Sequence, residues 1–465
     1  MEPEEFQGLE AAFCNLIDQN VSAQALHSFL SELQCCAPTK ADVALIKKLL
    51  SGFRRPGDPP RGGPGISRND SHFVESIIAL THRSGLPRID PPRSPWSIRD
   101  VGTELDFLAC SCYLPNLSPI QVVNLLLLRR IQPSKSVAVV ATIRDEGIYL
   151  LEWIAFQRAI GLADIFVYTN DNADGSDRLL TVLAGHGVIK LLRSSVRTGT
   201  NAQLKAYQHA IHLLHELRNY KWVMFLDADE FLVLKEAYDH NINEFLHRVE
   251  STFADSMPGA VLFPWDWRLS DLRFRRTAGL LFERYPHSVP HFCVKSATRL
   301  NATLGMCEVH FPTLAADARL VDSGLSPVER ESISGREPKS DEGGSIAHFW
   351  GKSFQEYAIK KRRGDLMGLH DTDFKYEFTE YFAWTAKLSA GNLRPLPRIL
   401  AKRVNRALME LKALPGVSPA IKEVNSRFKS FSRQVSKDMK LREKYNEMRS
   451  SIQPILDSEI CGPAD

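Results

Sequence analysis

A run of large apolar side chains that ends in three carboxylates constrains this sequence more than any other feature. Residues 222–226 (Trp-Val-Met-Phe-Leu) are followed at once by Asp227, Asp229 and Glu230. The run is too short for a buried helix and is typical of a strand covered on both faces. In an extended segment Asp227 and Asp229 point to the same side, where they repel each other unless a cation joins them. The pattern favours a site for a divalent cation with oxygen ligands, and the alternative is a strand that ends in an acidic turn.

Composition places the chain among soluble globular proteins. Its 465 residues allow two or three domains, and 44% hydrophobic and 24% charged residues are ordinary values. The net charge of +3 is close to balance, and no nucleic-acid partner is predicted. The eight cysteines include no CxxC spacing, which predicts free thiols in a reducing compartment.

No targeting or membrane-spanning segment is recognised in the sequence. The acidic residues 1–5 do not resemble a secretory signal, and the densest apolar window, 122–128, is far shorter than the roughly 20 residues that cross a bilayer. We therefore expect a cytoplasmic protein. The basic C-terminal region could also bring the protein into peripheral contact with the inner face of the membrane.

The chain divides into three predicted regions. Residues 1–130 form a mainly helical accessory region with Pro- and Gly-rich linkers at 54–67 and 87–95. Residues 134–368 form the central domain. Residues 369–465 form a basic helical region, in which Ile399 or Leu400 begins an amphipathic stripe and Pro415-Gly416 breaks the helix.

The central domain begins with strands that alternate with helices. Strands are predicted at 136–142, 164–170, 188–192 and 222–226, with a helix in each interval, the last one at 202–217, and this order indicates a mainly parallel sheet. Ligands bind beyond the carboxyl ends of such strands. Acidic or polar loops follow there at 144–146, 170–176 and 227–230, which predicts a cleft for a nucleotide and a metal. Neither GxGxxG nor GxxxxGK[ST] is present.

The second half of the domain has a mixed pattern. A strand with two tryptophans is predicted at 261–267, an exposed loop at 320–345, and an apolar and aromatic stretch at 346–353 that continues into a basic helix. Taken in order, the following stretches form a recognisable set: Arg144-Asp145-Glu146, Leu151-Glu152-Trp153, Gly161, 171–176, Asp227-Ala228-Asp229-Glu230-Phe231, Glu283-Arg284-Tyr285, Val294-Lys295-Ser296, His310, His348-Phe349-Trp350, Lys352-Ser353, Lys360 and Arg363-Gly364.

This set, over about residues 134–368, resembles the glycosyltransferase family 2 superfamily, and most closely its bacterial branch and the related family 92 type. The resemblance implies the GT-A fold, a Rossmann-like, mostly parallel α/β sheet flanked by helices, here with helical N- and C-terminal extensions. The chain departs from the family pattern at Asp145, where Asn is usual, and at residues 267–271, where a Trp-x-Phe-Gly-Ser-like stretch is usual. The second departure lies in the acceptor region, so the resemblance does not identify the acceptor or the catalytic base.

The resemblance also implies an activity, which is the inverting transfer of a sugar from a nucleotide diphosphate donor of the UDP type. The acceptor would be a glycan, a lipid-linked carbohydrate or another hydroxyl compound. Mn²⁺ or Mg²⁺ would neutralise the leaving diphosphate. The alternative is a non-catalytic protein that binds sugar nucleotides or other partners on the same fold. A nucleotidyltransferase would need a Gly- and Arg-rich loop after the first strand, which the sequence lacks.

Roles for individual residues follow from the resemblance. The metal ligands would be Asp227, Asp229 and His348, and the nucleotide would contact Arg144, Glu146, Asp174, Asp227, Lys352, Lys360 and Arg363. Asp174 could instead form a turn, His348 could be a packed core residue, and the basic helix could simply face solvent.

Inverting transfer requires a base on the acceptor hydroxyl. The base candidates are Asp266 and Asp271, with Glu283 as a third that is better explained by a structural ion pair with Arg284.

Overall fold

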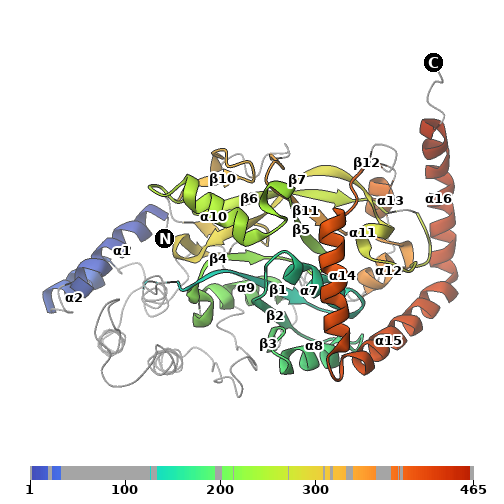
Figure 1. The fold of residues 1–465 in the computed structure, drawn as a ribbon, viewed down its shortest axis with the longest axis horizontal. Coiled ribbons are helices and arrows are strands. Elements are labelled where there is room, and N and C mark those ends of the chain that lie inside the picture. Colours follow the sequence, from blue (N-terminus) through green and yellow to red (C-terminus); the bar gives the residue numbers. More distant parts are fainter. Residues whose placement is uncertain are drawn as a thin grey trace.

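The fold is described from a computed structural model, shown in Figure 1. It describes residues 3–18, 23–32, 126, 133–193, 202–212, 214–270, 272–306, 309–314, 318–330, 339–362, 379–385, 387 and 391–460. The linkers predicted at 54–67 and 87–95, and the site candidates Asp271 and Arg363, lie outside these residues.

Helices and strands alternate along the central part of the described chain. The helices are α1 (Pro3–Asp18), α2 (Ala23–Glu32), α7 (Gly147–Ala159), α8 (Ser176–Gly185), α9 (Ala202–His212), α10 (Ile242–Thr252), α11 (Leu281–Arg284), α12 (Phe354–Arg362), α13 (Thr379–Thr385), α14 (Arg398–Ala413), α15 (Val417–Lys437) and α16 (Met439–Ile460). The strands are β1 (Lys135–Ile143), β2 (Ile165–Thr169), β3 (Lys190–Arg193), β4 (Tyr220–Phe225), β5 (Glu230–Leu234), β6 (Ala260–Arg268), β7 (His287–Arg299), β8 (Thr303–Gly305), β9 (Thr313–Leu314), β10 (Leu320–Asp322), β11 (Gly344–His348) and β12 (Asn392–Leu393).

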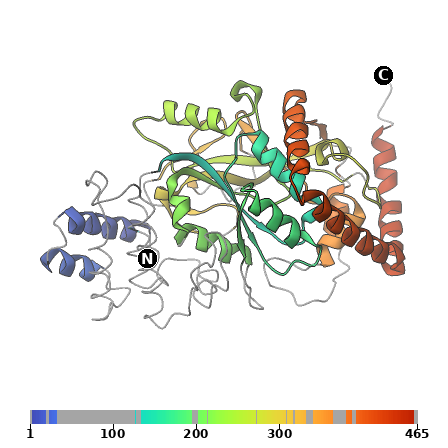
Figure 2. The same ribbon diagram turned by 60° about the horizontal axis from the view of Figure 1, so that its bottom comes forward.

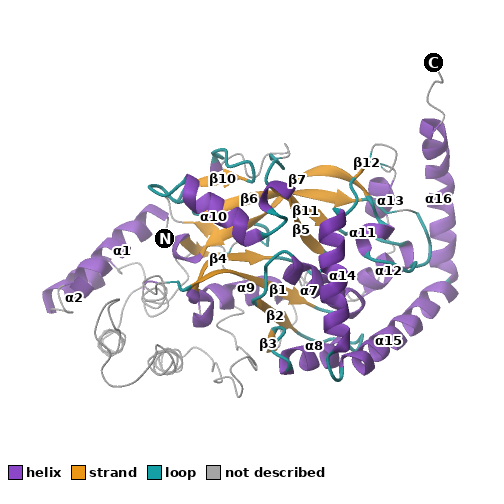
Figure 3. Cartoon of the chain, in the orientation of Figure 1, coloured by secondary structure: helices purple, strands orange, loops and turns teal. Residues whose placement is uncertain are grey.

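One mixed sheet organises the molecule. Its main strand order is β3-β2-β1-β4-β7-β6-β11-β5, and the first four strands are parallel. β7 runs antiparallel to both β4 and β6, while β11 is parallel to β6 and antiparallel to β5. Helices flank the sheet (Figure 3), so the predicted α/β class, a mostly parallel sheet flanked by helices, is confirmed.

The C-terminal helices complete the main hydrophobic core. α14 packs against α7, and α15 packs against α7, α8 and α12, as Figures 1 and 2 show for the red helices at one end of the molecule. Leu400 and Val404 of α14 and Val417 and Val424 of α15 are buried in the same cluster as the sheet residues. Ile399 is 51% exposed, so the predicted stripe begins at Leu400. This packing explains why α7 is apolar on most of its surface: the sheet and the C-terminal helices cover it from two sides.

Two local predictions were wrong. Residues 320–345 were expected to form an exposed loop, but β10 is buried and pairs in parallel with β6, and β11 already begins at Gly344. The helix predicted to continue to Leu217 ends at His212 as α9, and a 3-10 helix follows at His215–Asn219. Within the described residues, none of the helices combines the length and the hydrophobicity that a bilayer crossing requires.

Candidate functional site

The three carboxylates after the central strand lie in a tight turn. β4 ends at Phe225, and the backbone N–H of Glu230 donates to the carbonyl oxygen of Asp227 over 3.0 Å before β5 starts. The expectation that Asp227 and Asp229 share one side of an extended segment is therefore wrong. The turn sends the two side chains to different cations, and this separation sets the chemistry of the site.

Asp229 lies in a buried cluster of two lysines and a histidine. Its Oδ2 accepts from Lys360 Nζ at 2.7 Å and from Lys352 Nζ at 3.4 Å, and its Oδ1 lies 3.6 Å from Nε2 of His348. Burial would raise the pKa of Asp229, but the two ammonium groups hold that pKa well below its ordinary value. Two lysines around one carboxylate leave a local excess of positive charge.

Sheet register explains why these residues meet. β11 runs antiparallel to β5, so His348 lies opposite Glu230, and the N–H of Phe349 donates to the carbonyl oxygen of Asp229 over 2.9 Å. The chain then turns sharply at Lys352 and enters α12, which carries Lys360. Burial lowers the pKa of His348 and makes the neutral imidazole the stable form, although Asp229 acts in the other direction.

Asp227 faces a second buried cation, Lys295. Lys295 Nζ lies 3.3 Å from Asp227 Oδ2 and 3.2 Å from Glu230 Oε2, and Gln203 donates to Asp227 Oδ1. Burial opposes the charge on Lys295, yet the two carboxylates raise its pKa above the ordinary value. Two carboxylates share one ammonium group here, and burial raises the pKa of the more enclosed one, Glu230.

The loops after β1 and β2 are tied together by their own acidic side chains. Asp145 Oδ1 accepts from the backbone N–H groups of Ala173 and Asp174 at 2.6 and 3.1 Å. Asp174 accepts from Gly147 N through Oδ2 at 2.7 Å and from Ser176 N through Oδ1 at 2.9 Å. Both oxygens of Asp174 thus accept backbone hydrogen bonds, which favours the turn-forming role over nucleotide contact.

Three residues around the site have a left-handed backbone conformation. Asp145, Asp171 and Lys352 have φ values of 53°, 46° and 54°, in the left-handed region that most side chains avoid. Such conformations cluster at ligand sites, where the surrounding structure holds them. Asn and Asp are the residues that tolerate this region best, and both can accept through Oδ1. Asp145, which stands where the family pattern usually has Asn, therefore preserves the local geometry.

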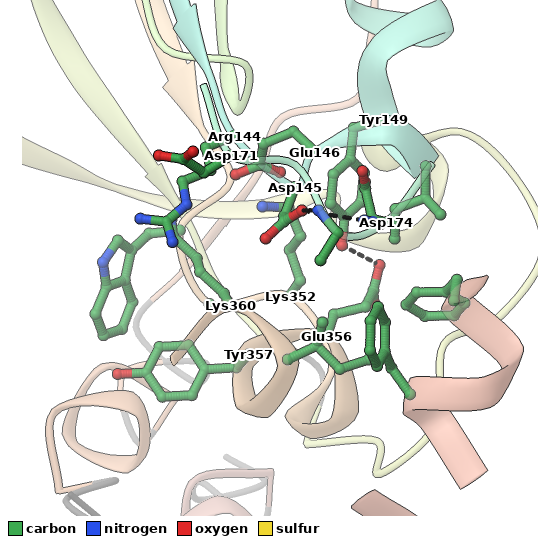
Figure 4. Close-up of a pocket in the computed structure, with 17 residues that line it drawn as sticks. Arg144, Asp145, Glu146, Tyr149, Asp171, Asp174, Lys352, Glu356, Tyr357 and Lys360 are labelled. Carbon is green, nitrogen blue, oxygen red and sulfur yellow. Dashed lines mark hydrogen bonds between the residues drawn. The ribbon is translucent and has the colours of Figure 1, made fainter. Parts of the chain in front are cut away.

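A cavity of about 360 Å³ lies between these loops and α12, within the usual size range of small-molecule sites. Figure 4 shows the side chains of the β1 and β2 loops above it, Glu356 and Tyr357 of α12 below it, and Lys352 and Lys360 between them. The lining residues are Arg144, Asp145, Glu146, Ile148, Tyr149, Asp171, Ala173, Asp174, Trp350, Gly351, Lys352, Glu356, Tyr357, Ile359, Lys360, Phe428 and Phe431. The two lysines that hold Asp229 therefore also form part of the cavity wall.

Comparison with known families agrees with this architecture. Residues 138–270 match the sequence model of glycosyltransferase family 92. This stretch covers less than a third of the chain. It runs from β1 to just beyond β6 and contains Asp227, Asp229 and the acidic loops, and it identifies the protein as a glycosyltransferase enzyme, as predicted. No curated protein matches the chain. His348, Lys352, Lys360 and the C-terminal helices lie beyond the matched stretch.

The three predicted metal ligands, Asp227, Asp229 and His348, do not all lie together. Asp229 and His348 face each other, but Asp227 is engaged by Lys295. In the part of the chain that the structure describes, no three His, Cys, Asp or Glu side chains are arranged to hold a metal ion. Asp229 is ionised and His348 is neutral, as metal ligands must be, and Mg²⁺ commonly binds one or two protein groups together with substrate phosphates. The pair fits an ion that enters with a diphosphate and competes with Lys360 for Asp229.

The structure separates Asp266 from this cluster. Asp266 and Arg268 project from one face of β6 and form a buried ion pair at 3.1 Å. Trp265 and Trp267 project from the other face, where both rings contact His348. The sheet therefore lies between Asp266 and the Asp229 cluster.

Glu283 and Arg284 do not pair as expected. The Glu283 carboxylate accepts from the N–H of Leu280, while Arg284 pairs with Glu356 at 3.0 Å. The interpretation of Glu283 as the ionic partner of Arg284 is wrong. The sequence pattern did not reveal Glu356 as an ion-pair partner, because Arg284 and Arg276 come from distant segments of the chain. His310, which belongs to the matching set, lies against the Trp265 ring at 5.0 Å between centroids.

Proposed function

We propose that the cavity binds the nucleotide diphosphate part of a sugar donor, of the UDP type, and that the protein transfers the sugar to a hydroxyl acceptor. One observation carries the proposal: Lys352 and Lys360 both contact Asp229 and both line the cavity. Two ammonium groups against one carboxylate suit an anionic ligand, and an ammonium group is a good partner for phosphate oxygens.

The nucleoside would lie toward the loops after β1 and β2. Glu146 lines the cavity there, beside Arg144, and a carboxylate can accept from base N–H groups and ribose hydroxyls. Asp174 holds the loops in place and contacts the ligand less directly. The diphosphate would then lie next to Lys352 and Lys360, at the end of the cavity nearest Asp229.

Transfer requires the acceptor hydroxyl to lose its proton as its oxygen attacks the anomeric carbon and the bond to the diphosphate oxygen breaks. Charge builds up on the departing diphosphate, and the side chains of Lys352 and Lys360 can stabilise it without reorganisation. A divalent ion held by Asp229 and His348 would act as a Lewis acid on the same oxygens. Lys352 is well placed for this task because the ring of Tyr149, 4.5 Å from its Nζ, and Asp229 fix its position.

By resemblance we propose inversion at the anomeric carbon and a glycan or lipid-linked acceptor. The exposed basic residues of α14 and α15, such as Lys402 and Lys429, would allow a cytoplasmic enzyme to approach an anionic membrane surface.

Incubation of the full-length protein with a panel of nucleotide sugars tests the proposal. We expect slow release of UDP from a UDP-sugar, with a higher rate when Mn²⁺ or Mg²⁺ is present and a large loss when a chelator is added. NMR of the released sugar would show that the anomer formed first has the configuration opposite to that of the donor. Absence of both binding and hydrolysis for every nucleotide sugar would contradict the proposed donor site.

A further inference from the structure

Two half-buried phenylalanines of the C-terminal helix α15 line the cavity. Phe428 and Phe431 are three residues apart, and with Val424 and Val435 they form one stripe of the helix. Val424 is 1% exposed and Val435 is 5% exposed, so both ends of the stripe are packed. The two aromatic rings in the middle are only half-buried because the cavity lies in front of them.

The N-terminal half of α15 is fixed on the loops that surround the cavity. Val424 packs so closely on Gly147, at the start of α7, that a Cβ added there would lie 2.9 Å from its Cγ1. Glu423 forms an ion pair with Arg178 of α8 at 3.2 Å. The same Cβ would lie 2.8 Å from Oδ2 of Asp174, so α15 and the β2 loop both pack against position 147.

The C-terminal half of α15 is fixed on α12. Gln355 Nε2 donates to the carbonyl oxygen of Ser432 at 2.8 Å and to Ser436 Oγ at 3.2 Å. Because α12 also carries Lys360, α15 bridges the two sides of the cavity. Phe428 and Phe431 lie between these two anchors, and the guanidinium of Arg276 lies 5.7 Å from the Phe428 ring centroid.

We propose that Phe428 and Phe431 form the wall on which the nucleobase of the donor stacks. The inference rests on the proposed donor site and adds a specific role for α15. The cavity has lysines at one end, carboxylates along the β1 and β2 loops, and aromatic rings on α15. A nucleoside diphosphate needs these three surfaces: cations for phosphate, acceptors for base and ribose edges, and a flat apolar surface for the base. The donor site is thus completed by a helix far outside residues 138–270.

The test compares UDP with inorganic pyrophosphate, which has the phosphates but no base. Dissociation constants for both are measured by calorimetry in one Mg²⁺ buffer, for the full-length protein and for Phe428→Leu/Phe431→Leu. Leucine keeps an apolar side chain at each position, so the helix remains packed while the aromatic face is lost. We expect UDP to bind about tenfold more weakly or worse, with pyrophosphate affinity within about twofold of wild type.

Two further variants separate stacking from helix packing. Phe428→Tyr/Phe431→Tyr restores aromatic faces and should bind UDP as the wild type does, and Lys429→Ala, an exposed neighbour on α15, should change neither affinity. For the leucine variant the KM for the donor should rise more than kcat falls. Unchanged UDP affinity in the leucine variant, or equal losses for UDP and pyrophosphate, would overturn the stacking role alone. A wild-type protein that binds neither compound would overturn the proposed donor site as well.

Discussion

Two buried carboxylates, Asp229 and Glu356, are both neutralised by cations, but in different ways. Asp229 is held by lysines, and the side chain of Lys360 is 26% exposed toward the cavity. Glu356 is held by Arg284 at 3.0 Å and Arg276 at 3.3 Å, and it also accepts from the hydroxyls of Tyr149 and Tyr285, both at 2.8 Å.

This difference indicates that Asp229 belongs to the ligand site and that Glu356 has a structural role. Arginine forks and tyrosine hydroxyls satisfy Glu356 completely and join α7, α11 and α12 into one unit. Lysines are compact point charges on flexible stems, so they can leave Asp229 and turn to a ligand. The Glu356 network thereby positions α12, and α12 presents Lys360 to the cavity.

Removal of the Glu356 charge should have the largest effect on stability. Glu356→Gln leaves Arg284 buried without its anionic partner, and breaking such a pair typically costs about 3–5 kcal/mol. Urea unfolding of the two proteins at pH 7 measures the change. A loss below about 1 kcal/mol would show that the Glu356 network does not support the fold and would remove the contrast with Asp229.

The same pair predicts a pH dependence. Burial alone would raise the pKa of Glu356, but Arg284 and its other partners lower it to about 2. Because this folded-state value lies below the unfolded value of about 4.5, the stabilisation is complete above pH 4.5 and is lost as the pH falls toward 2. The stability gap between wild type and Glu356→Gln should narrow over this range. A constant gap would contradict the assignment.

Loss of Lys360 should weaken diphosphate binding with little effect on folding. Lys360→Ala removes a partly buried cation, and its partner Asp229 still has Lys352, so we expect UDP and pyrophosphate to bind about tenfold more weakly. The matched control is Lys361→Ala, which removes the exposed neighbouring cation of α12. If the two variants bind UDP equally well, Lys360 does not contact the phosphates.

A third carboxylate, Glu152, should show the smallest effect. Burial raises its pKa to about 7, and the N–H of Leu281 donates to Oε1 at 2.6 Å. A raised carboxyl pKa means that the folded state holds a proton that the unfolded state releases, so stability declines as the pH rises from about 4.5 to 7. Glu152→Gln should flatten the pH profile of the unfolding temperature between pH 5 and 8. An unchanged profile would place the pKa of Glu152 near its ordinary value.

Local pattern predicted the first half of the fold well. Short apolar runs such as residues 222–226 predict buried strands. Their alternation with helices predicted the parallel strands around β1. Residues brought together by long-range register were partly predictable: His348 and Lys360 were found by resemblance, but their contact with Asp229 depends on the pairing of β11 with β5. Glu356 and Phe428 were missed because most of their neighbours come from distant parts of the chain, such as Tyr149 for Glu356 and the β1 and β2 loops for Phe428.

The central claim is that Asp229 organises the cations that receive the departing diphosphate. The most direct measurement is the rate of UDP release by Asp229→Asn, taken together with its unfolding temperature. We predict a rate loss of at least about 100-fold in a protein that stays folded, because Lys360 can reach solvent and Lys352, whose pKa burial already lowers, can release its proton. UDP release at the wild-type rate by folded Asp229→Asn would contradict the account.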